Sequence, residues 1–167
     1  MRIRSVSVIM ALLVAAPLTA CSNDGADLGP YIDAVAANLA KPPKDDGPPL
    51  SEEQARCAAE SVIDAIDEDI ITGFGTPEAL VAASEDNLAS LNLDDATLDV
   101  IASDFVACVG GVQFMLDFLT EVGVSDEQVS CVRDSITDDE MVRQVRADLA
   151  GGTLEEFDNE MGACLGE

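Results

Sequence analysis

The chain has 167 residues, of which 33 are acidic, eight are basic and none is histidine, giving a formal net charge of −25 at pH 7. Nucleic-acid binding is excluded, because so negative a chain repels phosphates and no basic stripe offsets the repulsion. A length below about 200 residues favours a single domain, and a hydrophobic content of 48% argues against disorder throughout. Because only 4% of residues are aromatic and none is tryptophan, we expect an aliphatic, all-α protein.

Residues 1–20 have the pattern of a secretory signal peptide. Two arginines precede an apolar run over residues 6–16, which is too short to span a bilayer. The following Leu-Thr-Ala-Cys21 resembles the bacterial lipobox, in which the cysteine receives a diacylglycerol and becomes the first mature residue. We expect a lipoprotein held through lipidated Cys21 at the outer face of the bacterial cytoplasmic membrane. The alternative is ordinary secretion, with Cys21 as a spare thiol or a disulfide partner.

Residues 21–49 are expected to form a spacer. Its last part, residues 41–49, reads Lys-Pro-Pro-Lys-Asp-Asp-Gly-Pro-Pro, in which proline disfavours helix and favours extended backbone. Residues 30–40 have the pattern of a short helix with its apolar side chains on one face: Tyr31, Val35 and Leu39. Both a free helix within the spacer and a helix docked on the body are consistent with this pattern.

An internal repeat begins at Leu50. Residues 50–64 align without gaps on residues 124–138 with six identities in fifteen positions. Residues 97–108 align on residues 153–164 with four identities in twelve positions. Each copy therefore reads as a helix with one cysteine, further helical material, and a last helix that ends in a second cysteine.

The alignment divides the body into two degenerate helical repeats. Repeat 1 is predicted over residues 50–123 and repeat 2 over residues 124–167. The first copy is longer, and we interpret residues 73–90 as its insertion.

Helix starts are marked by hydroxyl side chains placed three residues before Glu or Gln, the capping-box arrangement. Four such pairs occur in the body: Ser51–Gln54, Ser125–Gln128, Thr137–Glu140 and Thr153–Glu156. Thr76 and Asp94 are predicted as further N-caps. Helix ends are predicted at Gly73, Gly123 and Gly151.

Apolar spacing indicates which residues share a helix. One helix is predicted to carry a stripe through Ala58, Val62, Ile66 and Ile70. Residues 105–122 are apolar nearly all round and predict a central helix, in which Gly110-Gly111 permits a kink.

Without Cys21, four cysteines remain in an exported chain, and they allow three disulfide pairings. Equivalent positions in two copies should make equivalent bonds, so we predict Cys57 with Cys108 and Cys131 with Cys164. No zinc or redox site is expected, because the closest two are 23 residues apart and histidine is absent. The expected fold is a small disulfide-stapled helical bundle without metal or cofactor.

The sequence contains no recognisable catalytic arrangement. Without histidine the usual base and the common triads are missing, and 33 carboxylates single out no acid–base pair. We expect a non-enzymatic acidic module that binds a protein or cationic partner in the cell envelope. The alternative is an apolar-ligand (lipid) carrier with a cavity inside the bundle. A large apolar void would favour this carrier, and the residues expected to line it are Phe105, Phe114, Met115 and Phe118.

The body resembles exported proteins and lipoproteins of actinobacteria that carry helical Cys repeats. The resemblance extends from Tyr31-Ile-Asp-Ala-Val-Ala through Ser-Glu-Glu-Gln-Ala-Arg-Cys57 and Thr-Pro-Glu-Ala-Leu80 to Ala-Cys164. It covers most of the chain, implies an extracytoplasmic setting on a lipid anchor, and assigns no activity.

Overall fold

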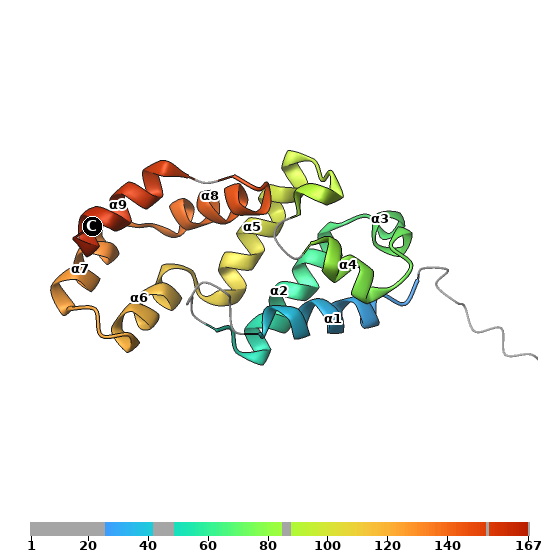
Figure 1. Cartoon of the computed structure of the whole chain (residues 1–167), viewed down its shortest axis with the longest axis horizontal. Helices are drawn as coiled ribbons and strands as arrows, with labels where there is room; N and C mark the ends of the chain where they lie inside the picture. Colours follow the sequence, from blue (N-terminus) through green and yellow to red (C-terminus); the bar gives the residue numbers. More distant parts are fainter. Residues whose placement is uncertain (1–25, 42–48, 85–87, 153, 167) are drawn as a thin grey trace, which may run out of the picture.

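The computed structural model describes residues 26–41, 49–84, 88–152 and 154–166, and within these ranges all regular secondary structure is helical, without strands. The helices are α1 (Gly29–Leu39), α2 (Glu52–Ala65), α3 (Glu68–Gly73), α4 (Pro77–Ala83), η1 (Ala89–Leu91), α5 (Asp95–Val109), α6 (Gly111–Glu121), α7 (Asp126–Ser135), α8 (Asp138–Leu149) and α9 (Glu155–Leu165). The molecule is elongated, with α1 to α4 toward one end and α6, α7 and α9 toward the other (Figure 1). The predicted all-α, disulfide-stapled fold is confirmed.

Two separate apolar cores hold the helices together. The N-terminal core lies among α1 to α5 and is centred on Ile63, Ile71 and Ile101, which are all fully buried. The C-terminal core lies among α6, α7 and α9 around fully buried Val132. We call α1 to α5, with η1, the N-terminal lobe, and α6, α7 and α9 the C-terminal lobe. The cores thus divide at the α5–α6 junction, upstream of the repeat boundary predicted at residue 123.

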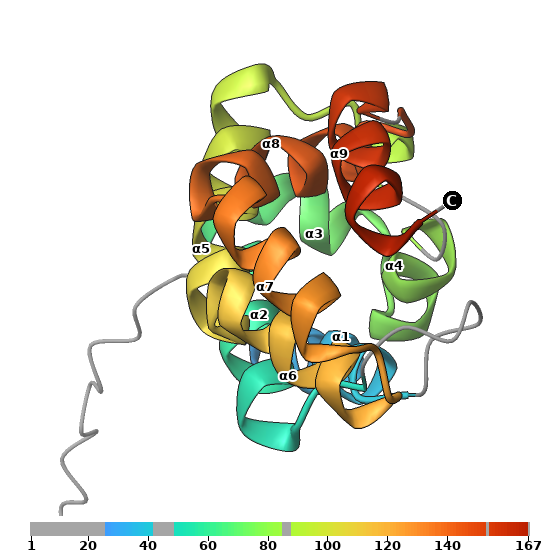
Figure 2. The same cartoon turned by 90° about the vertical axis from the view of Figure 1, so that its left-hand side faces the viewer.

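Helix α8 connects the lobes. It packs along α5 and against α6, and the view along the long axis shows it beside α5 (Figure 2). Leu149 at its end packs on the N-terminal core, whereas Met141 in its first turn packs on the C-terminal core. The guanidinium group of Arg146 binds the carboxylates of Asp95, at 2.7 Å, and Asp99, both on α5. These contacts hold α8 in place although none of its residues is fully buried.

The kink predicted at Gly110-Gly111 is confirmed, and it divides the expected central helix into α5 and α6, which are bent by 50°. Gly111 has φ +60°, and a Cβ atom there would overlap the carboxylate of Asp138. That carboxylate accepts a hydrogen bond from the backbone N–H of Val112 at 2.8 Å, so the first turn of α8 caps the start of α6. Among the described residues, no single helix is long and apolar enough to cross a membrane, and α5 with α6 qualifies only as this bent pair.

The helix starts follow the predicted capping chemistry. Ser51, Ser125 and Thr137 form complete capping boxes at the starts of α2, α7 and α8. Thr76 and Asp94 cap α4 and α5 through their side chains. The fourth predicted box begins at Thr153, which lies outside the described residues.

The single helix predicted through Ala58, Val62, Ile66 and Ile70 is wrong. Ile66 has extended backbone with φ −94° and ψ 138°, and Asp67 then caps α3. The break shifts the apolar register, so Ile71 enters the core and Ile70 is 37% exposed. In the second copy, extended Ile136 is followed by the cap residue Thr137 in the same way, but α7 has 10 residues against 14 in α2. The gapless sequence alignment therefore pairs residues at the end of α2 with residues that lie about one helical turn further along the second copy.

The short helix expected at residues 30–40 is observed as α1, and it is docked on the body. It packs against α2 and α4, and Tyr31 enters the N-terminal core. Asp33 of α1 also binds Arg56 of α2 at 2.9 Å. Part of the expected spacer is therefore a structural element of the N-terminal lobe, while residues 42–48 of the proline-rich segment lie outside the described ranges.

Candidate apolar ligand site

The two predicted disulfides are both present. Cys57–Cys108 joins α2 to α5, and Cys131–Cys164 joins α7 to α9, with Cα separations of 5.6 and 5.5 Å. Cys21, the predicted lipidation site, lies outside the described residues. The repeat was sufficient to select the correct pairing, because each bond lies within its own copy.

A second link is repeated in each copy and was not predicted. The Nε2 atom of Gln54 donates a hydrogen bond to the carbonyl oxygen of Val109 at 2.8 Å. The Nε2 atom of Gln128 donates equivalently to Leu165 at 2.7 Å. In both copies the acceptor is the residue directly after the second cysteine. The sequence signal is glutamine in both capping boxes, since glutamate would have no N–H to donate.

An apolar cavity of about 300 Å³ lies between the N-terminal lobe and α8. This volume is at the lower end of the range for small-molecule sites, about 300–1,000 Å³. Helices α1, α2, α4, η1, α5 and α8 all contribute to its walls. The lining residues are Val35, Asn38, Leu39, Val62, Ile66, Leu80, Val81, Ser84, Leu88, Leu91, Ile101, Phe105, Val145, Asp148 and Leu149.

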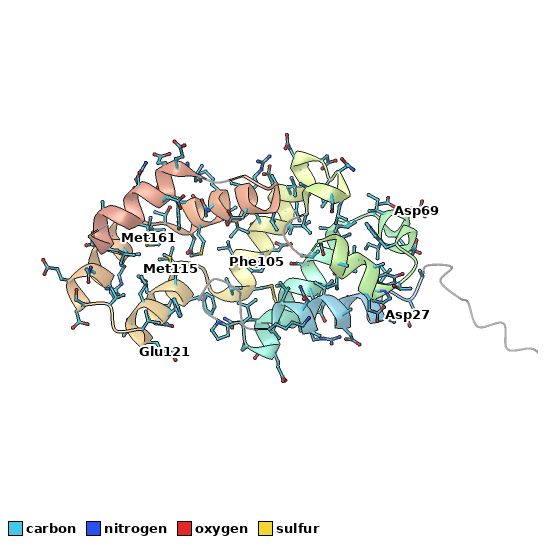
Figure 3. The ribbon with its side chains drawn as sticks, in the orientation of Figure 1. Asp27, Asp69, Phe105, Met115, Glu121 and Met161 are labelled. Atoms are coloured by element: carbon cyan, nitrogen blue, oxygen red, sulfur yellow. A yellow bond between two sulfur atoms is a disulfide. The ribbon has the colours of Figure 1, made fainter. Side chains whose placement is uncertain are left out.

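An apolar groove of about 380 Å³ adjoins the cavity and lies between α5, α6, α8 and α9. Leu39, Phe105 and Val145 line both hollows, so the two share a wall. Phe105 lies near the middle of the molecule and Met115 toward the C-terminal lobe (Figure 3). The other groove residues are Lys41, Leu50, Val106, Val109, Phe114, Met115, Met141, Gln144 and Phe157.

Three of the four residues proposed for an apolar-ligand site are in this place. Phe105, Phe114 and Met115 line the groove, whereas Phe118 lines neither hollow. The sequence did not indicate Val145, because its spacing matches an ordinary core stripe. Its position in the shared wall depends on how α8 crosses between the lobes.

Two polar side chains one helical turn apart on α8 lie at the site. Gln144 lines the groove and Asp148 lines the cavity, and Gln144 Nε2 donates a hydrogen bond to Asp148 Oδ1 at 3.0 Å. Within the described ranges, Gln144 Oε1 is the one buried side-chain polar atom without a hydrogen-bond partner. Partial burial raises the pKa of Asp148, the hydrogen bond from Gln144 opposes the rise, and the charge of Asp158 adds to it.

A larger hollow of about 490 Å³ lies beside the first disulfide and has a different character. Its walls include Ser61, Asp64 and Asp104 beside Cys57 and Cys108, so it is more polar than the other two hollows and is open to solvent. It is lined by α2 and α5 alone and contains no aromatic side chain.

The few basic side chains of the body are largely neutralised by acidic neighbours. Arg56 has a raised pKa, chiefly through its hydrogen bond with Asp33, and Arg146 has a raised pKa chiefly through Asp99. No charged residue in the described part of the chain is buried. Nor do three metal-ligating side chains gather there in a way that could hold a metal ion. The described residues therefore present hydrocarbon surface at the lobe junction and uncompensated acids elsewhere.

Comparison with known proteins adds no relative to this picture. No protein-family model, no curated protein and no solved structure matches the chain. The chemistry of the apolar site is therefore the basis for a functional assignment.

Proposed function

We propose that this protein is a non-enzymatic, lipid-anchored module of the cell envelope that binds the apolar part of a small amphiphile between its two lobes. The observation that carries the proposal is the pair of adjoining apolar hollows beside α8. A protein or cationic partner was the first expectation from the sequence and stays a prediction. The two hollows support the carrier alternative, because they adjoin each other and their linings are almost wholly apolar.

The lining of the site explains what such a ligand would gain. Phe105, Phe114, Val145 and Phe157 are only half-buried, although they face the hollows. Each methylene group transferred from water to an apolar environment contributes about 0.8 kcal/mol. A hydrocarbon chain would cover these side chains and lose its own contact with water at the same time.

The short link to the proposed lipid anchor supports the same role. Ala26, the first described residue, leads directly into the docked helix α1, and only four residues lie between Cys21 and Ala26. Even fully extended, the five Cα-to-Cα steps from Cys21 to Ala26 span at most about 18 Å. A lipidated Cys21 would keep the body beside the bilayer surface, so an amphiphile would travel only a short distance between bilayer and site.

A space-filling substitution tests the proposal. Val145→Phe places a larger side chain in the wall shared by the cavity and the groove, and should reduce binding of the apolar fluorescent probe N-phenylnaphthylamine by at least about tenfold. The matched control is Val122→Phe, because Val122 is 57% exposed and lines neither hollow. Fluorescence titration of the full chain carrying Cys21→Ala, which has no attached lipid, measures the affinity. Absence of binding to the parent chain, or an equal affinity in both variants, would contradict the proposal.

A further inference from the structure

The polar pair on α8 distinguishes this site from a purely hydrocarbon one. Gln144 belongs to the groove and Asp148 to the cavity, and Val145 between them in sequence belongs to both. The pair therefore lies where the two hollows share a wall. A ligand in the groove would lie against Gln144, and a ligand in the cavity would lie against Asp148.

The hydrogen bond within the pair fixes what it offers to a ligand. Gln144 donates through Nε2 to the carboxylate of Asp148 at 3.0 Å. The reverse orientation of the amide would point its oxygen at a carboxylate, so the observed orientation is the favourable one. This leaves Gln144 Oε1 as a buried acceptor without a partner, and a buried acceptor without a hydrogen bond is costly. The pair thus offers one buried acceptor without a partner, the amide oxygen of Gln144, and the carboxylate of Asp148, which is exposed to solvent.

The charges around Asp148 determine which head groups the pair can bind. Asp148 makes no ion pair with any described residue, and Arg143 and Arg146 of the same helix are bound to other acids. Asp158 of α9 adds negative charge near Asp148. Lys41 is the one described cation that lines the groove, and its Nζ atom donates a hydrogen bond to Asn38 Oδ1 at 3.1 Å. An anionic head group at Asp148 would be repelled, whereas a hydrogen-bond donor or a cation would be stabilised.

We infer that Gln144 and Asp148 form a head-group subsite, and that the ligand is a single-chain amphiphile whose head is a neutral or positively charged hydrogen-bond donor, such as a long-chain amine or alcohol. The inference rests on the proposed function, because it assigns the head of the ligand whose tail occupies the apolar hollows. The head donates to Gln144 Oε1 and to the carboxylate of Asp148.

Three probes with the same hydrocarbon chain and different heads test this assignment. Dodecylamine, dodecanol and dodecanoate compete with N-phenylnaphthylamine for the full chain carrying Cys21→Ala. The amine should bind at least about tenfold more tightly than the carboxylate, because its donors are charged and match the acceptors. Dodecanol should lie between the two.

Two variants locate the effect on the named residues. Asp148→Asn keeps the shape and removes the charge, and should weaken dodecylamine about tenfold while changing dodecanol by less than about threefold. Gln144→Leu keeps the size and removes the acceptor, and should weaken dodecanol by about fivefold. Lys41→Met removes the cation that lines the groove and should keep or raise the preference for the amine over the carboxylate, because an anionic head loses its attraction there.

The outcomes separate the two proposals. If all three probes compete equally and the variants change nothing, the subsite is refuted while apolar binding stands. Tightest binding of dodecanoate, abolished in Lys41→Met, would also refute it and would place the head at Lys41. If no probe competes and N-phenylnaphthylamine itself does not bind, the proposed function fails as well.

Discussion

The two lobes contain the same repeated links but are packed in different ways. In the N-terminal lobe, α2 packs closely against both α1 and α5, and four small residues are fully buried there: Ala55, Ala58 and Ala59 on α2 and Ala102 on α5. The C-terminal lobe has a smaller core, and flexible methionines pack around it only partly buried: Met115, Met141 and Met161. Methionine adapts to irregular spaces because it is unbranched and has several rotatable bonds. We infer that the first lobe is the rigid part of the molecule and the second the adaptable part, with the ligand site between them.

The disulfides of the two lobes also differ in burial. Cys57 is exposed, so the first bond adds to a helix pair that is already well packed. Cys164 is 8% exposed and belongs to the C-terminal core itself, so the second bond is part of the packing it stabilises. The two disulfides therefore make different contributions to the stability of their lobes, because the apolar core around each bond differs in size.

The largest effect is expected from removing the second disulfide. Loop-closure entropy alone predicts a loss of about 4 kcal/mol in the free energy of unfolding for either bond. In Cys131→Ala/Cys164→Ala the small C-terminal core should not compensate, so α7 and α9 should lose hydrogen-exchange protection while α2 and α5 keep theirs. Hydrogen exchange followed by mass spectrometry measures each helix separately.

The matched control is Cys57→Ala/Cys108→Ala. Its loss of closure entropy is similar, but the buried alanines should keep α2 and α5 protected. Equal loss of protection in both lobes, or loss confined to the N-terminal lobe, would overturn the comparison.

A smaller effect is expected at the junction of the lobes. Gly111→Ala places a side chain at φ +60° and against the carboxylate of Asp138, and should destabilise the protein by about 2 kcal/mol. Gly123→Ala has the same kind of backbone, with φ +86°, but no atom within 4 Å of its Cβ, and should cost about 1 kcal/mol. Urea denaturation measures both values, and equal costs would show that the contact between α6 and α8 contributes nothing.

The smallest effect is expected at Asp148. Folding raises the pKa of this carboxyl above its ordinary value of 3.8, so ionisation at neutral pH opposes folding. Asp148→Asn should therefore stabilise the protein at pH 7, by less than about 0.5 kcal/mol because the side chain is solvent-screened. The gain should disappear below about pH 4, where the carboxyl is protonated in both the folded and the unfolded state. Thermal denaturation between pH 3 and pH 7 checks this, and a gain that grows as the pH falls would contradict it.

Local chemistry explains which parts of the fold were predictable. Ser51, Ser125 and Thr137 cap helices through residues three positions away, so their roles can be read from short sequence windows. The disulfide pairing was predictable from the repeat. The break at Ile66 was not, because apolar spacing continues across it and the change of register depends on Asp67 starting a new helix.

The two hollows of the proposed ligand site were predictable only in part, for a related reason. Phe105, Phe114 and Met115 were recognised as large apolar residues on a helix without a polar face. Gln144 and Asp148 lie on a helix that reads as an ordinary surface helix with a core stripe. Their importance arises from α8 crossing between the lobes, which no spacing in the sequence records.

The most direct test of the central claim is native mass spectrometry of the protein isolated without detergent from the cells that produce it. The proposed function predicts one non-covalently bound amphiphile per chain, beyond any lipid on Cys21, and its absence from Val145→Phe but not from Val122→Phe. A chain that is isolated bare and stays bare after equilibration with dodecylamine would contradict an apolar ligand site between the lobes.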